Sequence, residues 1–271
     1  MSLEDTIRTV YSSRDGWSKK RVELRTNQVM DAVDRRRLDL KTWLNPGLNA
    51  GGRFLDLGCG AGMLVAAAGA EGFEGMGIDV SMEWLVVARK LIEEWGSKPV
   101  LAAAMAECLP LEDGGLDNVI SLDVIEHVGD MERYMVEIAR VTRDNGAVLV
   151  TTPNRYSLTP EPHVFVWGVG LVPRRFQKSY VEWVSGKSYE YTKLLSFVEI
   201  SSLFKRSLGS DYSISPGQIS EVELESFSSL KRQCARIYNH FLTCPSIRSA
   251  LLPISPYFVV HARKRRSAPG A

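Results

Sequence analysis

Short apolar runs alternate with amphipathic stretches between residues 52 and 152 of the chain. The apolar runs predict strands over residues 52–57, 74–79, 99–104, 116–122 and 147–152. The stretches between them predict helices over residues 62–70, 81–95 and 131–141. The run at 116–122 contains Leu116, Val119, Ile120 and Leu122, which favours a strand buried on both faces. Strands that alternate with helices in this way build a parallel sheet covered by helices on both sides.

The alternation does not extend to either end of the chain. Residues 3 to about 48 carry many charges on a partial apolar stripe and predict helices with a break near 12–16. We therefore expect an N-terminal helical cap over 1–48 and a second domain over 49–271. Residues 152–163 contain three prolines and no hydrophobic period, which predicts an insertion over about 154–190, after the fifth strand.

Weaker patterns follow the insertion. They predict a helix over residues 192–205, a strand over 212–214, a helix over 230–241 and a last strand over 256–262. The helix over 230–241 has an apolar face that consists of Cys234, Ile237, Tyr238 and Phe241.

The chain of 271 residues has a net charge of +1, with 45% hydrophobic and 24% charged residues. This composition is ordinary for a globular protein, and the small net charge argues against nucleic acid as a partner. The four cysteines form no Cys-x-x-Cys pair, which argues against a zinc knot or a disulfide scaffold and fits a reducing cytoplasm. No apolar run reaches the roughly 18 residues of a membrane-spanning helix, so we expect a cytoplasmic protein without a transmembrane segment.

The strongest local signal is the glycine turn of residues 56–62 (Asp-Leu-Gly-Cys-Gly-Ala-Gly), which follows the first predicted strand. Glycine lets the backbone turn sharply, and the N–H groups at the start of the next helix favour a carboxylate or phosphate. The spacing differs from the Gly-x-Gly-x-x-Gly of dinucleotide-binding proteins. Asp79 ends the next predicted strand, at about the distance from Asp56, roughly 20 residues, where nucleotide-binding α/β folds place a ribose-binding acid.

With these features the sequence resembles the class I S-adenosylmethionine-dependent methyltransferases, nearest in motif to the quinone-pathway O-methyltransferases. The resemblance rests on the glycine turn and on residues 77–81 (Gly-Ile-Asp-Val-Ser), 106–110 (Ala-Glu-Cys-Leu-Pro) and 116–128, which include Asp-Val-Ile-Glu-His. It implies S-adenosylmethionine as cofactor. It also implies a Rossmann-like, doubly wound α/β fold, whose seven-stranded sheet is mostly parallel with an antiparallel last strand beside the fifth.

The resemblance assigns cofactor binding to Asp56, Gly58, Cys59, Gly60, Asp79, Val80, Ala106, Glu107 and Leu122. Asp56 anchors the glycine turn and can reach the ammonium group of the cofactor. Asp79 accepts hydrogen bonds from both ribose hydroxyls, because a carboxylate can accept two donors in a forked geometry. Val80 packs on one face of adenine, and the backbone N–H of Ala106 reads the edge of the ring.

The expected adenine contact departs from the pattern of the relatives at one position. Many relatives have an acid immediately before the Ala-Glu pair, where this chain has Met105. Two interpretations are open: either Glu107 binds the adenine amino group, or Met105 packs on the ring.

His127 is the candidate catalytic residue. Methyl transfer is an in-line displacement at a methyl group on positive sulfur, so the protein chiefly aligns the nucleophile and excludes water. A hydroxyl acceptor must also lose a proton, which an imidazole just past the fourth strand can take. Asp123, Glu126 and His127 resemble sites in which some quinone-pathway and small-RNA 2′-O-methyltransferases hold a divalent metal. Many relatives carry these residues without one, and we expect no metal.

The insertion is the expected acceptor-binding segment, because it mixes aromatic and polar or basic side chains: Asn154, Tyr156, His163, Trp167, Arg174, Arg175 and Tyr180. Its two adjacent arginines can neutralise a phosphate or a carboxylate. We therefore expect methylation of a small-molecule or lipid-linked acceptor, at oxygen. The alternatives are C- or N-methylation of a metabolite, and a protein that binds the cofactor without transferring methyl.

Overall fold

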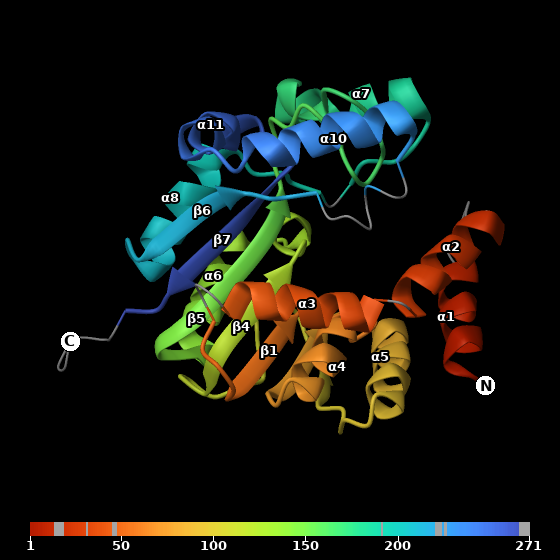
Figure 1. Cartoon of the computed structure of the whole chain (residues 1–271), viewed down its shortest axis with the longest axis vertical. Coiled ribbons are helices and arrows are strands. Elements are labelled where there is room, and N and C mark those ends of the chain that lie inside the picture. The colour runs from red at the N-terminus through yellow and green to blue at the C-terminus, as the bar shows by residue number, and fades with distance from the viewer. Residues whose placement is uncertain are drawn as a thin grey trace.

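The computed structural model describes residues 1–13, 19–30, 32–44, 48–190, 192–219, 224 and 227–265. They form one seven-stranded sheet of order β3-β2-β1-β4-β5-β7-β6 (Figure 1). The strands are β1 (Arg53–Leu57), β2 (Glu74–Asp79), β3 (Leu101–Ala103), β4 (Leu116–Leu122), β5 (Thr142–Pro153), β6 (Tyr212–Pro216) and β7 (Tyr257–Arg263). Strands β3, β2, β1, β4 and β5 pair in parallel, and β7 runs antiparallel between β5 and β6. The expected fold class is confirmed.

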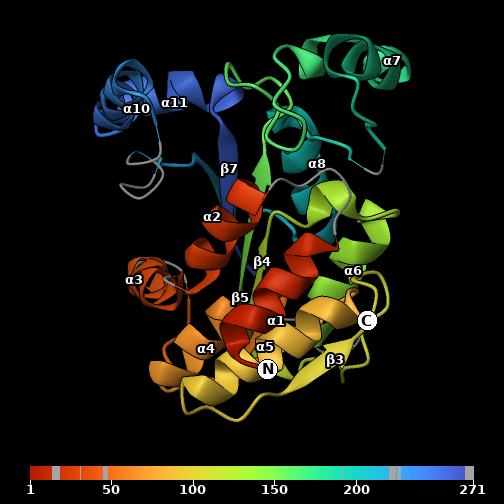
Figure 2. The same cartoon turned by 90° about the vertical axis from the view of Figure 1, so that its right-hand side faces the viewer.

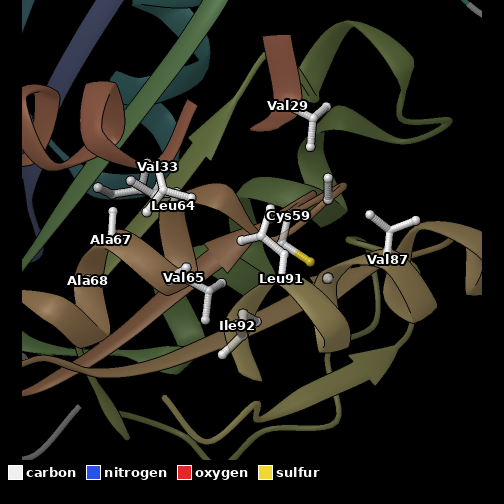
Figure 3. Close-up of a cluster of buried hydrophobic side chains, with 14 of the residues drawn as sticks. Val29, Val33, Cys59, Leu64, Val65, Ala67, Ala68, Val87, Leu91 and Ile92 are labelled. Atoms are coloured by element: carbon white, nitrogen blue, oxygen red, sulfur yellow. The ribbon is translucent and has the colours of Figure 1, made fainter. Parts of the chain in front are cut away.

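Different helices cover the two faces of the sheet. One face carries α3 (Ala32–Leu44), α4 (Met63–Ala70) and α5 (Met82–Glu94), and the other carries α6 (Met131–Val141) and α8 (Phe197–Leu208). Side chains alternate along a strand, so Phe54 of β1 packs into the first core while Leu55 and Leu57 pack into the second. Figure 3 shows the first core, where valines, leucines and alanines of the helices surround Cys59.

Two predicted boundaries shift for identifiable reasons. Helix α8 begins at Phe197 instead of residue 192, because Ser196 and Glu199 form a capping box in which each side chain bonds to the other residue's backbone N–H. Strand β5 begins at Thr142 instead of residue 147, because Thr142 already pairs with Leu116 of β4 ahead of an irregularity in the register.

The N-terminal residues form three helices, α1 (Leu3–Ser12), α2 (Lys19–Met30) and α3. Helix α1 packs on α5, where the rings of Tyr11 and Trp84 meet edge to face with centroids 5.0 Å apart. Helix α3 packs on α4 and is held by an ion pair between Arg37 and Glu71. The predicted break falls largely on residues 14–18, which lie outside the described part of the chain. These helices share the first core with the sheet, and the predicted domain boundary at residue 48 stays a prediction.

The insertion contains a helix that the sequence pattern did not predict, α7 (Arg174–Ser185), and a 3-10 turn, η2 (Val169–Leu171). It has a small core of its own, formed by Val164, Val166, Val169, Val181 and Tyr189. Two further helices, α10 (Ser229–Phe241) and α11 (Pro245–Leu251), separate β6 from β7.

The helices α7, α10 and α11 gather at one end of the molecule, beyond the carboxyl ends of the parallel strands (Figures 1 and 2). Figure 2 shows α10 and α11 on one side of this end and α7 on the other. Ligands of doubly wound sheets bind at the carboxyl ends of the strands, so these helices border the expected site. Among the helices within the described ranges, none is both long and apolar enough to cross a membrane.

Candidate functional site

The glycine turn has the backbone geometry that its sequence predicts. Gly58, Gly60 and Gly62 all have positive φ values, of 81°, 48° and 75°. A side chain at Gly58 would place its Cβ 2.2 Å from Val124, and one at Gly62 would meet Ala88 at 2.7 Å. At Gly60, in contrast, no heavy atom lies within 4 Å of a Cβ position. Gly58 and Gly62 are therefore required by packing, whereas Gly60 presents bare backbone to open space.

Replacing Gly58 with alanine is expected to lower the free energy of unfolding by about 2–4 kcal/mol, because a positive φ and a close contact with Val124 act together. The matched control is Gly60→Ala, where φ is also positive, at 48°, but where there is space for the methyl group. Urea unfolding followed by circular dichroism measures both variants. Equal losses in the two variants would show that the Val124 contact adds nothing.

Asp79 closes the glycine turn against the end of β2. Its Oδ2 accepts a hydrogen bond of 2.8 Å from the backbone N–H of Gly60, and its Oδ1 accepts one of 2.8 Å from Ser81. Ser81 in turn caps α5, because its side chain accepts a hydrogen bond from the backbone N–H of Trp84. Each carboxylate oxygen keeps a second acceptor site, so the half-buried side chain can accept further donors such as ribose hydroxyls.

Asp56 is buried at the end of β1, with 4% of its surface exposed. Burial raises the pKa of its carboxyl group from 3.8 to about 7, opposed by the positive charge of Arg36 and assisted by the negative charge of Asp79. A cation placed against this buried carboxyl group would stabilise its charged form and lower its pKa.

The other predicted cofactor residues differ in what they can offer. The Cys59 side chain points into the core of Figure 3, and burial raises the pKa of its thiol, so only its backbone can meet a ligand. Val80 is 75% exposed at the mouth of the turn and can cover a flat ring. Ala106 and Leu122 are partly buried and pack against the two cores.

Glu107 takes part in local structure. Its Oε1 accepts a hydrogen bond of 2.9 Å from the backbone N–H of Gly129 and a longer one of 3.4 Å from Asp130, the residue that caps α6. Met105, the other adenine candidate, is 60% exposed. If Met105 packs on the adenine ring, the hydrogen bonds of Glu107 to Gly129 and Asp130 stay intact. The structure therefore favours Met105 over Glu107 as the adenine contact.

The 3-10 turn η1 (Ile125–His127) brings His127 to the glycine turn, because Val124 directly before it packs on Gly58. The Nε2 atom of His127 lies 3.1 Å from Nε2 of His163 in the insertion. The Nδ1 atom of His163 lies 2.5 Å from Oε1 of Glu161, a carboxylate that is 5% exposed. Glu161 also accepts backbone hydrogen bonds of 2.8 Å from His163 and Val164. These three side chains form a continuous hydrogen-bonded chain, the Glu161–His163–His127 chain.

Glu161 was not among the residues expected in the site. The only local signal was an acid between two prolines, two residues before a histidine. The structure shows that Glu161 holds the His163 ring in place and affects its charge. Burial lowers the pKa of His163, but the hydrogen bond and charge of Glu161, with Glu126 and Asp123 further away, raise it above its ordinary value overall.

Glu126 is the most unusual group beside this chain. It is 1% exposed, its Oε2 accepts a 3.0 Å hydrogen bond from Thr152, and its Oε1 has no partner. Burial, together with the charge of Asp123, raises the pKa of Glu126 to about 8. An unsatisfied buried carboxylate oxygen is costly, and a cation or a donor from a ligand would satisfy it.

Glu126, His127 and His163 can offer one ligand atom each within 4.8 Å of one another. A carboxylate with two imidazoles suits a divalent transition metal, and the unpartnered oxygen of Glu126 fits that use. Asp123, which the sequence analysis grouped with Glu126 and His127, instead accepts a 2.9 Å hydrogen bond from Thr151 and is not part of this set. The histidine that completes the set comes from the insertion.

The candidate acceptor residues of the insertion divide into structural and exposed groups. Asn154 is buried and donates to the carbonyls of Pro253 and Ser255, so it fastens the insertion to the segment before β7. Arg174 pairs with Glu199 at 2.6 Å and is therefore already neutralised. Its neighbour Arg175, which stacks on Phe176, remains exposed. Of the two arginines that were expected to neutralise an anion, Arg175 is therefore the one that is available for this role.

A separate cavity of about 510 Å³ opens at the opposite edge of the sheet. Its lining includes Arg53, Glu74 and Leu116, the first residues of β1, β2 and β4. None of the predicted cofactor residues lines it. The chemistry-bearing residues therefore lie at the carboxyl edge, away from this cavity.

Residues 55–150 match the family of the methyltransferase domain. The ubiquinone biosynthesis O-methyltransferase of Ruegeria sp. (strain TM1040) is 28% identical over 187 residues, which cover 69% of each protein. The enzyme of the same name from Sinorhizobium medicae (strain WSM419) is 28% identical over 55% of this chain and 56% of its own length. In most such matches the chain spans about half the length of the curated relatives.

Solved structures share the fold at low sequence identity. The Haemonchus contortus phosphoethanolamine N-methyltransferase 2 in complex with S-adenosyl-L-methionine superposes with a TM-score of 0.58 at 18% identity, covering 98% of this chain and 60% of that one. A Thermotoga maritima S-adenosylmethionine-dependent methyltransferase, described as a possible histamine N-methyltransferase, gives a TM-score of 0.55 at 16% identity, covering 97% and 100%. These likenesses establish the architecture.

Proposed function

We propose, on the premise that this chain belongs to the class I S-adenosylmethionine-dependent methyltransferases, that it transfers a methyl group from S-adenosylmethionine to an oxygen of a small-molecule or lipid-linked acceptor. The single observation that carries the proposal is the Glu161–His163–His127 chain beside the glycine turn. A hydroxyl must lose its proton as it attacks the methyl group. The Glu161–His163–His127 chain can receive that proton beside the glycine turn. The ubiquinone-pathway relatives support oxygen as the acceptor atom.

The cofactor would lie across the carboxyl ends of β1 and β2. The bare backbone at Gly60 accommodates its methionine end, the free acceptor sites of Asp79 take the ribose hydroxyls, and Val80 covers adenine. The raised pKa of the buried Asp56 supports a role beside the ammonium group, whose positive charge would favour the carboxylate.

His127 is the proposed general base. Glu161 accepts from Nδ1 of His163 and so leaves Nε2 of His163 facing Nε2 of His127. One of the two facing nitrogens donates and the other accepts, which holds both rings in place. A proton taken by His127 can therefore be shared with His163, whose positive charge the carboxylate of Glu161 stabilises.

The same residues would fit a divalent cation as an alternative to the general base, because a cation would occupy the imidazole nitrogens that otherwise exchange protons. Glu126, His127 and His163 would hold it. Such a cation, when bound, supplies Lewis acidity that lowers the pKa of an acceptor hydroxyl. The unpartnered Oε1 of Glu126 supports this assignment, which departs from the expectation of a metal-free site.

The direct test is transfer of a tritium-labelled methyl group from S-adenosylmethionine to a series of catechols with and without a polyprenyl chain. We expect a labelled methyl ether from the full chain. Asp79→Asn should weaken cofactor binding about tenfold or more in calorimetry, because charge-assisted hydrogen bonds are lost. Glu74→Gln, at the exposed start of the same strand, is the matched control and should leave binding unchanged.

Other results of this assay would overturn the proposal. A labelled C-methyl or N-methyl product would show that the acceptor atom is carbon or nitrogen and not oxygen. Tight cofactor binding without any labelled product, also from a metabolite extract, would favour a cofactor-binding protein without methyl transfer.

We further propose a cytoplasmic location and no nucleic-acid partner. All four cysteines are free, which fits a reducing compartment. The net charge of +1 offers little long-range attraction for nucleic acid.

A further inference from the structure

Helix α10 turns its apolar face away from the protein. Leu230, Cys234, Ile237 and Phe241 follow one another at the spacing of one helix face. All four are exposed, Leu230 to 74%, Ile237 to 47% and Phe241 to 45% of their surface. A surface helix of a globular protein normally turns such a face inward, so this exposed apolar stripe needs an explanation.

Polar side chains hold α10 in this orientation. Asn239 exchanges two hydrogen bonds with the backbone of Ile219, of 2.7 and 3.0 Å. Tyr238 donates to the carbonyl of Gly217 at 3.0 Å, and Arg232 donates to the carbonyls of Leu224 and Phe227. Because the polar side is fastened to the protein, the apolar stripe faces outward in the folded protein itself.

The sequence of α10 and α11 carries basic side chains and no acidic one. From residue 227 to residue 265 the sequence contains no aspartate or glutamate, and the nearest acids precede the helix at 221, 223 and 225. Lys231 and Arg236 of α10 lie on either side of the stripe, and Arg248 follows in α11. An exposed apolar stripe between basic side chains has the character of a helix that lies in the interface of an anionic membrane.

Helix α10 lies at the same end of the molecule as α7 (Figures 1 and 2). Helix α7 also exposes apolar side chains, with Phe176 at 51% and Trp183 at 83%. Both helices lie beyond the carboxyl ends of the parallel strands, where His127 is positioned. One flat surface could contact this end and thereby face the opening of the site.

We propose that α10 docks the protein on an anionic lipid surface, with the apolar stripe in the headgroup region and Lys231 and Arg248 against lipid phosphates. A second copy of the chain is a poorer occupant, because a two-fold contact through α10 would bring like charges together. The inference goes beyond the proposed methyl transfer and needs no acceptor, so the two fail independently. A docked protein would meet a lipid-linked acceptor without extracting it into water.

The test is flotation of the full chain with vesicles of phosphatidylcholine alone or mixed with phosphatidylglycerol. We expect binding that is about tenfold stronger to the mixed vesicles and that falls with added salt. Ile237→Ser combined with Phe241→Ser should abolish flotation, and Lys231→Gln combined with Arg248→Gln should remove the preference for phosphatidylglycerol. Val86→Ser combined with Val136→Ser, which changes exposed valines of α5 and α6, is the matched control and should float like the wild type.

Unfolding temperatures of all variants show whether the fold is intact. No flotation of the wild type at low salt, or equal flotation of the Ile237/Phe241 and control variants, would overturn the proposal. If the wild type is a dimer in analytical ultracentrifugation and the Ile237/Phe241 variant is a monomer, the stripe binds a second copy of the protein and not a lipid surface.

Discussion

Replacing His127 with alanine is expected to lower the turnover number for a water-soluble catechol about 100-fold or more, with little change in the affinity for S-adenosylmethionine. The imidazole ends the Glu161–His163–His127 chain and is the exposed member that a hydroxyl can reach. The turn that carries it ends at Val128, beyond the packing of Val124 on Gly58, so its loss should not disturb the glycine turn. Single-turnover transfer of labelled methyl and calorimetry with the cofactor measure the two quantities separately.

Two further variants define what His127 does. His240→Ala removes an exposed histidine from α10 and should retain full turnover. Glu161→Gln keeps the shape of the carboxylate but removes its charge, so a smaller loss is expected, with the pH–rate profile displaced to lower pH because the carboxylate no longer raises the pKa of His163. A His127→Ala variant that loses cofactor affinity but keeps turnover would make this residue structural.

Manganese titration separates the general base from the metal ligand. If Glu126, His127 and His163 hold a cation, electron paramagnetic resonance should detect bound Mn²⁺ in the wild type and its loss in His127→Ala. If the wild type keeps its turnover in the presence of a chelator while His127→Ala stays impaired, His127 acts as the general base and not as a metal ligand.

Asp56→Asn is expected to stabilise the protein above neutral pH while weakening cofactor binding. The folded protein raises the pKa of Asp56 from 3.8 to about 7, so the native state holds a proton that the unfolded chain releases. The associated stability is fully present below pH 3.8 and is lost as the pH rises through about 7. This pKa shift corresponds to a loss of roughly 4 kcal/mol in the free energy of unfolding at high pH. Asparagine, which carries no charge, should recover about 2–4 kcal/mol of it at pH 8.

Thermal unfolding without cofactor measures this effect. At pH 8 the melting temperature of Asp56→Asn should exceed that of the wild type by about 5–10 °C, and the difference should shrink as the pH approaches 4. Asp211→Asn, an exposed substitution of the same kind, is the control. Cofactor affinity of the wild type should rise with pH through about 7, because deprotonated Asp56 attracts the ammonium group, and should be flat in the variant. A variant that is no more stable at pH 8 would contradict the burial argument.

The sequence predicts strands β1 to β5 and the backbone of the glycine turn well because the determinants there are local. Each strand from β1 to β5 follows from its own apolar run, and the glycine turn encodes its positive φ values directly. The buried orientation of Cys59 could not be predicted, because it depends on the packing of Gly77 and the helices around it.

The surroundings of His127 are poorly predicted because the contacts there are distant in sequence. All of α6, all of β5 and the first residues of the insertion separate His127 from His163, so no local pattern indicates that the two rings meet. Helix α10 shows a different limit. Cys234, Ile237 and Phe241 share one face as predicted, but Tyr238, which was expected on the same face, bonds to Gly217 instead. The spacing of apolar residues also does not say whether a face turns inward, and here the hydrogen bonds of Asn239 and Tyr238 hold it outward.

The place of β7 in the sheet also sets an order of events during synthesis. This strand fills the gap between β5 and β6, so β5 has an open edge until residues 257–263 have left the ribosome. Throughout that time the apolar residues Val148 and Val150 lack their neighbours Ala262 and Val260. Open strand edges pair readily with other chains. A ribosome that stalls on the α10–α11 segment would therefore hold a nascent chain whose central sheet is ready to aggregate.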